Sequence, residues 1–384
     1  MKLYTLQFWL LCASHALFGA SFTMIIPELP SYLSSLGGAD HKGWIIALFT
    51  IMAAISRPFS GKLSDTVGRM PVMIFGTLVC VVCSAMYPLL PTVAGFLILR
   101  FLHGFSTGFK PTASTAYLAD IVPANRRGEA MGVLGVSMNL GVSASPPVGS
   151  WIAGVWGLDT MFYTSSGMAF LSILILLGMK ETLQERQPFS FSLLKVSRHD
   201  IVDPRAFPPA IVTMLIYFCY GTLLTIVPDQ SEWLGMSNKA IFFSSLTLAS
   251  VAARLFAGRA SDRYGRVGVI KVSTLLVSAS LLVMGLGESV MMIIVGASLV
   301  GFSTGLAAPS VFAWTIDRSD EAARGRAMAT TYIALEIGIG SGALISAWIY
   351  DSTPANFFSA FLVTALMPFL AWLYLHFVFG KKAV

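Results

Sequence analysis

The chain has 384 residues, of which 55% are hydrophobic and only 11% are charged. Because soluble globular proteins have roughly one-quarter charged residues, this composition excludes a water-soluble protein, a disordered chain, a disulfide-rich scaffold and a nucleic-acid-binding module. The net charge of +6 comes from basic residues scattered over short connections, which is typical of a membrane protein. At ~20 apolar residues per crossing, the length allows about a dozen membrane helices.

Twelve apolar stretches are long enough to cross a bilayer, and they fall into two sets of six. In chain order the sets are 6–28, 43–60, 71–90, 94–119, 129–150 and 160–179, then 208–228, 237–257, 268–287, 289–316, 327–350 and 356–379. A polar connection separates the sets. We therefore expect an all-α membrane protein with an N-terminal six-helix bundle (1–179), a linker (180–207) and a C-terminal six-helix bundle (208–384).

Lysine and arginine are concentrated in alternate connections, and the intervening connections hold only Lys42 and Lys239. Cytoplasmic loops of membrane proteins carry the excess of basic residues. We therefore expect a multi-pass protein of the inner (plasma) membrane, with both termini and the linker in the cytoplasm.

The two halves repeat each other at an offset of 197 residues. The run Gly-Phe-Ser-Thr-Gly at 104–108 falls on the identical run at 301–305, Asp65 falls on Asp262, and Asp120 falls on Asp317. Two parallel six-helix repeats are typical of transporters, in which the substrate site lies near the bilayer midplane between the repeats. This repeat argues against a receptor or a channel subunit.

Three motifs stand out along this repeat. The connection from Gly61 to Arg69 (Gly-Lys-Leu-Ser-Asp-Thr-Val-Gly-Arg) has a degenerate copy at 258–266, Arg100 precedes two spaced glycines in the fourth stretch, and the fifth stretch carries Gly132, Gly141, Pro146 and Gly149. Over nearly the whole chain these motifs resemble those of the major facilitator superfamily. The fifth-stretch motif is similar to that of its 12-helix drug/proton antiporter (efflux) branch, with two glycines replaced by serines.

This resemblance implies a fold of two pseudo-symmetric six-helix bundles and a conformational latch in the two related loops. Glycine permits a tight turn, and an acid or arginine beside it can pair with a helix end or an opposite charge. The latch residues implied are Gly61, Asp65, Gly68, Arg69, Gly258, Asp262 and Arg266.

The cations of the fourth stretch have no counterpart in the second half. Arg100, His103 and Lys110 fall on Ala297, Val300 and Ala307. At 100° per residue the three lie within about 80° on one helix face, and a charge at mid-depth costs at least ~2.5–3.5 kcal/mol if it faces lipid. We expect them to line a wet cavity and bind substrate. The alternative is a set of structural ion pairs within the N-terminal half.

Acidic side chains inside the membrane are candidates for proton coupling. Glu336 falls by the offset on Asn139 and lies about nine residues, or ~14 Å, from the inner end of its stretch. A carboxyl group at this depth can exchange a proton as a cavity opens to either side; the alternative is a neutral Glu336 bonded to backbone. Glu28, at an outer helix end, is a second candidate or an ordinary solvated residue. Arg100 is the third group assigned to coupling, and Asn139, Tyr217 and Tyr220 are candidate substrate-contacting wall residues.

No nucleotide-binding loop of the form G-x-x-x-x-G-K-[ST] is present, so the energy for transport is expected from an ion gradient. We expect no enzyme activity, cofactor, metal or nucleic-acid partner, and a monomer in the lipid bilayer. The predicted function is proton-coupled efflux of a small organic solute that is anionic, zwitterionic or amphiphilic. The alternatives are proton-coupled uptake of a sugar or organic acid, and a non-transporting membrane sensor or partner-binding protein.

Overall fold

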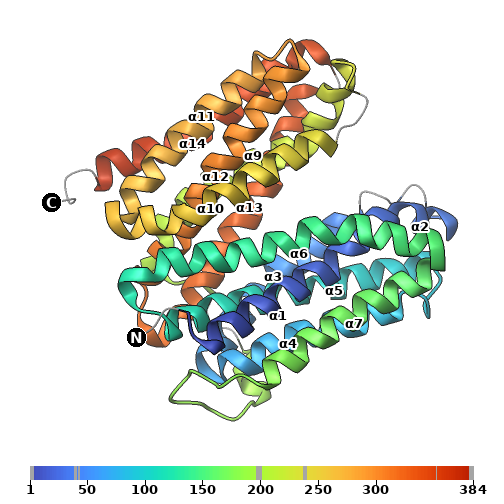
Figure 1. The fold of residues 1–384 in the computed structure, drawn as a ribbon, viewed down its shortest axis with the longest axis vertical. Coiled ribbons are helices and arrows are strands. Elements are labelled where there is room, and N and C mark those ends of the chain that lie inside the picture. Colours follow the sequence, from blue (N-terminus) through green and yellow to red (C-terminus); the bar gives the residue numbers. More distant parts are fainter. Residues whose placement is uncertain are drawn as a thin grey trace. The chain divides into compact units, whose positions relative to one another are not determined.

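The computed structural model describes residues 4–38, 41, 44–195, 201–236, 240–351 and 353–379, and the regular structure in these ranges is helical (Figure 1). The first half contains α1 (Leu6–Met24), α2 (Leu29–Ser35), α3 (Trp44–Thr66), α4 (Arg69–Met86), α5 (Val93–Ile121), α6 (Arg127–Trp156) and α7 (Leu158–Leu177). The second half contains α9 (Phe207–Trp233), α10 (Ala240–Tyr264), α11 (Arg266–Gly285), α12 (Val290–Arg318), α13 (Arg324–Tyr350) and α14 (Phe357–Phe379).

Each of the twelve predicted stretches overlaps one long helix, so the predicted all-α fold is confirmed. Within the described residues, ten helical segments are long and apolar enough to cross a membrane. Helices α5 and α6 are equally long but less apolar, because α5 contains Arg100 and Lys110 and α6 is rich in glycine, serine and proline.

The chain forms two compact units. Unit 1 comprises Met1–Pro123, Leu134–Asp203 and Ser319–Thr330, and unit 2 comprises Ala124–Val133, Pro204–Arg318 and Thr331–Val384. The first turns of α6 therefore belong to unit 2, and those of α13 belong to unit 1. The bundle boundaries expected at 179 and 208 stay a prediction.

The same packing order occurs inside each unit. In unit 1, α3 and α4 pack on α5, and α7 packs on α1 and α4; in unit 2, α10 and α11 pack on α12, and α14 packs on α9 and α11. The small residues of the repeat permit this packing. A Cβ atom at Gly104 would lie 2.2 Å from the carbonyl oxygen of Phe49, and one at Gly301 would lie 2.0 Å from that of Leu246. The internal repeat is thus a repeat of helix contacts.

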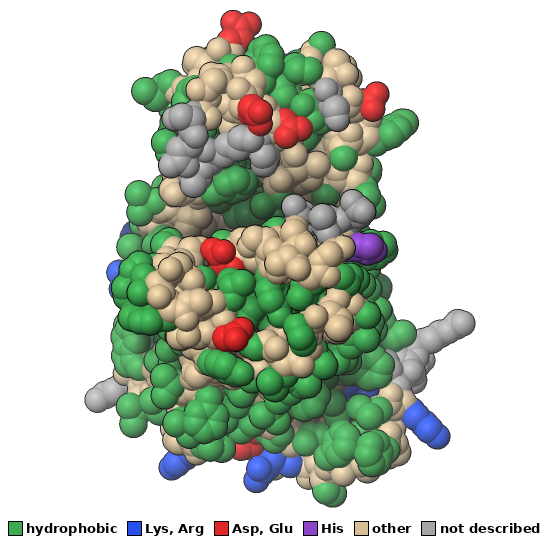
Figure 2. Space-filling model, turned by 90° about the vertical axis from the view of Figure 1, so that its right-hand side faces the viewer, with side chains coloured by type: hydrophobic (Ala, Val, Ile, Leu, Met, Phe, Trp, Pro, Cys, Tyr) green, Lys and Arg blue, Asp and Glu red, His purple; other side chains and the backbone are tan. Residues whose placement is uncertain are grey.

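Large apolar side chains cover much of the surface, as the face drawn in Figure 2 shows. Trp348 is 81% exposed, Phe377 is 75% exposed and Leu248 is 73% exposed. Contiguous apolar surface of this kind marks a region that contacts something other than water. For helices of this length and composition, the contacting medium is the hydrocarbon of a bilayer.

Candidate functional site

The first turn of α13 is held by the carboxylate of Asp65 at the end of α3. Asp65 accepts hydrogen bonds from the backbone N–H groups of Gly325 and Arg326, both at 2.8 Å. The first N–H groups of a helix have no partner within the helix and form its positive end. The acidic side chain therefore caps a helix that begins 259 positions later in the chain, since α13 starts at Arg324.

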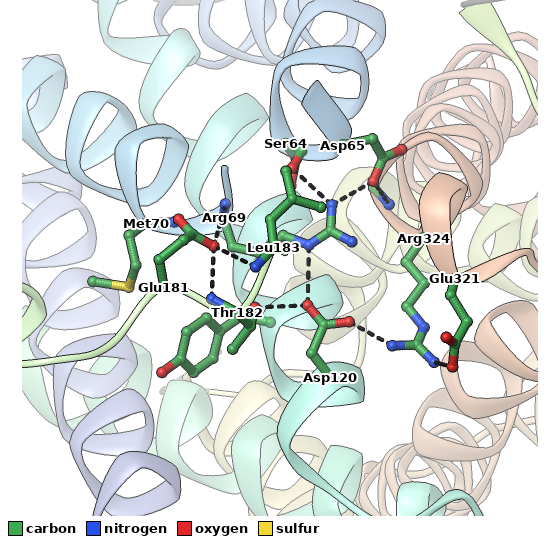
Figure 3. A network of polar contacts seen from close by, with 12 residues as sticks. Ser64, Asp65, Arg69, Met70, Asp120, Glu181, Thr182, Leu183, Glu321 and Arg324 are labelled. Atoms are coloured by element: carbon green, nitrogen blue, oxygen red, sulfur yellow. Dashed lines mark hydrogen bonds and ion pairs between the residues drawn. The ribbon is translucent and has the colours of Figure 1, made fainter. Parts of the chain in front are cut away.

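Arg69 and Asp120 extend this cap into a network of alternating charges (Figure 3). Arg69 is 1% exposed and lies between two acids, pairing with Asp65 and, at 3.2 Å, with Asp120. The second oxygen of Asp120 accepts from Arg324 at 2.5 Å. Arg324 also pairs with the exposed Glu321 at 3.1 Å. Because each inner charge has two opposite neighbours, the network joins the ends of α3, α4 and α5 to the start of α13.

Unit 2 contains the same arrangement at an offset of 197 residues. Asp262 of α10 accepts from the backbone N–H groups of Gly128 and Glu129 at 3.0 and 2.9 Å, in the first turn of α6. Arg266 pairs with Asp262 and, at 2.9 Å, with Asp317. Arg127 reaches the other oxygen of Asp317 at 2.8 Å. The charged residues predicted for the latch thus lie in one charge network per unit, and the role of the latch residues stays a prediction.

Glycines bring the backbones close enough for these contacts. A Cβ atom at Gly61 would lie 2.9 Å from that of Ala329, and one at Gly258 would lie 2.2 Å from the carbonyl oxygen of Gly128. Gly68 and Gly265 have φ values of +138° and +84° at the caps of α4 and α11, a conformation that favours glycine.

Glu181 makes further contacts in unit 1 that have no counterpart among the described residues of unit 2. Its carboxylate accepts from the backbone N–H groups of Arg69 and Met70 at 3.1 and 2.9 Å, and so caps α4. Thr182 donates to Asp120 at 2.7 Å. Glu181 was not predicted from the sequence, because it is one of many charges in a polar connection and the offset places Val378 opposite it. Asp120, Asp317, Arg127 and Arg324 were also given no role there, although their repetition was a usable signal.

Lys110 of α5 is fully buried inside unit 1. Its Nζ atom donates to the carbonyl and hydroxyl oxygens of Ser14 at 3.0 and 2.9 Å and to the hydroxyl of Ser172 at 2.5 Å. The ring of Phe18 lies 4.8 Å from the ammonium group. Within the described residues all of these partners are neutral. None of them is the acidic side chain that a structural ion pair of Lys110 would need. The side chain is enclosed by α1, α5 and α7, and its contact with substrate stays a prediction.

Arg100 and His103 are also buried in unit 1. Arg100 donates to the carbonyl of Ile45 at 3.0 Å, and its guanidinium lies 4.6 Å from the centre of the Phe49 ring. His103 lies 3.4 Å from the Tyr87 hydroxyl and 3.2 Å from the Cys80 sulfur. Arg100 also donates to the Tyr87 hydroxyl at 3.5 Å, so Arg100 and His103 share this partner, whereas the partners of Lys110 are different ones. In the described part of the chain, no group of three or more His, Cys, Asp or Glu residues is arranged to hold a metal ion.

Two predicted wall residues lie together in unit 2. The rings of Tyr217 and Tyr220 on α9 stack with centroids 5.3 Å apart, and the Tyr220 hydroxyl lies 3.3 Å from the Thr304 hydroxyl on α12. Arg254 of α10 is near enough to both tyrosines to act on them electrostatically. Arg254 was not predicted to have a role, because the predicted stretch 237–257 ends three residues after it, whereas α10 continues to Tyr264.

The remaining candidates are half-buried and separate from one another along the chain. Asn139 lies on α6, Glu336 lies on α13 within unit 2, and Glu28 ends a short 3-10 turn after α1. Their roles in substrate binding and proton coupling stay predictions.

The glycine-proline motif packs α6 against α1. A Cβ atom at Gly141 or Gly149 would lie 2.1 Å from the carbonyl oxygen of Ala16 or Met24, respectively. Between these glycines, the Ser145 hydroxyl lies 2.7 Å from that of Thr23, so the serine replaces close packing by a hydrogen bond. Pro146 follows on a half-buried position. Gly132 belongs to the part of α6 that lies in unit 2. A Cβ atom there would lie 2.8 Å from the carbonyl oxygen of Arg254.

The variant Gly141→Ala is expected to lower the thermal melting midpoint of the purified protein by several degrees, because backbone on α1 occupies the space that the methyl group needs. The matched control is Gly154→Ala on the same helix, where a Cβ atom would meet nothing within 4 Å. That variant should be neutral or slightly stabilising, since alanine is the better helix former. Equal melting midpoints for the two variants would contradict the close packing of α6 on α1.

Most of the chain is similar to known membrane transport proteins. The sequence model of the Major Facilitator Superfamily matches residues 11–230 and again residues 209–383. The multidrug resistance protein MdtG of Klebsiella pneumoniae (strain 342) is 28% identical over 380 residues, covering 93% of this chain and 89% of the relative. The protein of the same name from Serratia proteamaculans (strain 568) is 29% identical over 374 residues, covering 94% and 89%.

Solved structures share the fold at low sequence identity. The human organic anion transporter MFSD10 (TETRAN) superposes with a TM-score of 0.84 at 20% identity, covering 96% of this chain and 98% of that one. A variant of the E. coli fucose:proton symporter FucP gives a TM-score of 0.80 at 14% identity, covering 98% and 99%. Because the family model matches most of the sequence, the chain belongs to the major facilitator superfamily and is a multi-pass secondary transporter rather than an enzyme.

Proposed function

We propose that this protein exports a small organic solute in exchange for protons. The observation that carries the proposal is the similarity over more than nine-tenths of the chain to proteins named multidrug resistance protein MdtG. The packing of Gly141, Ser145 and Gly149 of α6 on α1 agrees with it, because this is where the chain resembles the antiporter branch.

We further propose that the solute carries an anionic group, and Lys110 is the basis for this preference. The ammonium group meets three oxygen acceptors of Ser14 and Ser172, all of them neutral, in the described part of unit 1. A buried ammonium without a carboxylate partner is an expensive arrangement in a membrane helix. An anionic solute that reached this site would supply the missing opposite charge and gain a charge-assisted hydrogen bond.

The sign of proton movement in liposomes tests the direction of coupling. The purified protein is reconstituted with a pH-sensitive dye in the lumen, with equal pH on both sides and with the membrane potential clamped by potassium and valinomycin. When solute is added outside, antiport moves protons out of the lumen and makes it more alkaline. Symport moves protons inward with the solute and makes the lumen more acidic, which would favour uptake as the function. Protein-free liposomes correct for solutes that cross as neutral acids.

The variant Lys110→Met tests the solute preference, since methionine retains an unbranched side chain without the charge. The proton response to anionic and zwitterionic solutes is expected to fall about ten- to hundredfold, because a hydrogen bond to a charged group contributes ~1.5–3 kcal/mol. The matched control is Lys271→Met on α11 of unit 2, which should respond as the wild-type protein does. If cationic solutes alone respond, or if Lys110→Met equals wild type, the anionic preference is wrong.

A further inference from the structure

Unit 1 has an apolar groove on the side of α3, α4 and α5, which we call the lateral groove. Its volume is about 670 Å³, within the ~300–1,000 Å³ range of small-molecule sites. Leu63, Val72 and Phe109 are buried at its floor, whereas Ile55 and Phe75 on its walls are 53% and 46% exposed. The lateral groove therefore opens on the apolar surface of the protein.

A segment of the linker contributes two side chains to the lateral groove. The backbone N–H of Gln187 donates to the carbonyl of Thr66 at 2.9 Å, and the Lys62 ammonium donates to the carbonyl of Lys195 at 2.8 Å. Between these two anchors, Phe189 and Leu194 line the lateral groove. The segment 187–195 is thus attached at both ends to the last turns of α3.

A polar hollow of about 510 Å³ adjoins the lateral groove and shares two of its residues, Val67 and Phe189. The polar residues that line this hollow are Gln184, Arg186 and Gln187. A guanidinium group and two amides are donors that suit a phosphate group. Glu185 is the acid beside Arg186 in the chain.

The two compartments together match an amphiphile with an acyl chain and an anionic head. Lipid tails are as apolar as leucine side chains, so the lateral groove alone gains little by preferring one lipid over another. Selection must come from the polar hollow, where basic residues attract anionic lipids. We propose that unit 1 binds one anionic phospholipid, with an acyl chain in the lateral groove and its phosphate in the polar hollow. This proposal does not depend on the direction or substrate of transport.

Native mass spectrometry of the full-length protein, with phosphatidylglycerol or phosphatidylcholine of the same acyl chains, measures the first lipid bound. Phosphatidylglycerol should bind at least about fivefold more tightly, because each basic residue near a membrane surface contributes about that factor. The variant Arg186→Gln should abolish most of this preference, and because Arg186 is exposed its loss leaves folding unaffected. The control Arg263→Gln, an exposed arginine at the end of α10, should retain the preference.

The groove itself is tested by two tryptophan substitutions on α3. Ile55 and Ile46 are both 53% exposed, but only Ile55 lines the lateral groove. Ile55→Trp should weaken the first binding step for both lipids several-fold, whereas Ile46→Trp should leave it unchanged. Equal affinity for the two lipids in the wild-type protein, a preference that survives Arg186→Gln, or equal effects of the two tryptophans would each overturn the proposal.

Discussion

Replacing Asp65 by alanine should raise the amide hydrogen-exchange rate in the first turn of α13 by at least about 100-fold. Gly325 and Arg326 lose the acceptor of their backbone N–H groups, and Arg69, 1% exposed, loses one of its two acids. Removing one partner of a buried ion pair costs ~3–5 kcal/mol. Mass spectrometry of peptides that cover 320–332 measures the change.

The matched control for Asp65→Ala is Glu321→Ala. Glu321 pairs with Arg324 of the same network, but its side chain is 91% exposed. Exposed ion pairs contribute ~0–1 kcal/mol, so exchange in α13 should rise less than about fivefold. Asp262→Ala should raise exchange at the start of α6 in the same way as Asp65→Ala does for α13. If the amide hydrogen-exchange rate in the first turn of α13 is the same in Asp65→Ala and Glu321→Ala, the cap does not stabilise α13.

Replacing Glu336 by glutamine is expected to abolish solute-driven proton movement while solute binding is retained. Glutamine has nearly the same size but cannot bind and release a proton, so a carrier that depends on this carboxyl group loses its coupling. The internal dye measures proton movement, and the shift of the melting midpoint on adding solute measures binding.

The control for Glu336→Gln is Glu288→Gln, which removes an exposed acid between α11 and α12. This variant should move protons as the wild-type protein does. Proton movement that is unchanged in Glu336→Gln would remove Glu336 as the coupling group. Glu28 would then be the next acid to replace.

Hydropathy predicted the helices well because each membrane crossing needs its own apolar stretch, whatever its partners are. Helix ends were less accurate: the predicted stretch 43–60 is α3, which continues to Thr66 through polar residues of the connection 61–69. Those residues stay helical because Asp65 and Arg69 are neutralised across the turn. Local hydropathy contains no information about such a partner.

The charge networks were predictable in part. The repeat at 197 residues identified Asp65 and Asp262 as equivalent, and it contained Asp120 and Asp317 as well. Their partners could not be assigned, because Asp120 and Arg324 are 204 positions apart and many basic residues were available.

The partners of Lys110 could not be predicted from the sequence for a related reason. Its acceptors, Ser14 and Ser172, are 96 and 62 positions away, and nothing distinguishes them from other serines in apolar helices. The face of α5 that carries the cations was predictable from helical spacing, but which helices cover that face was not.

The first turns of α13 belong to unit 1, and this has a consequence for the order in which the chain is synthesised and folds. The last segment of unit 1 is Ser319–Thr330. It is separated by more than 100 positions from the segment before it, which ends at Asp203. At ~5–20 residues per second, a ribosome needs about 6–25 s to pass from residue 203 to residue 330. During that interval Asp65 and Arg69 are already made while the N–H groups of Gly325 and Arg326 are not. Completion of unit 1 therefore waits until most of unit 2 has been translated.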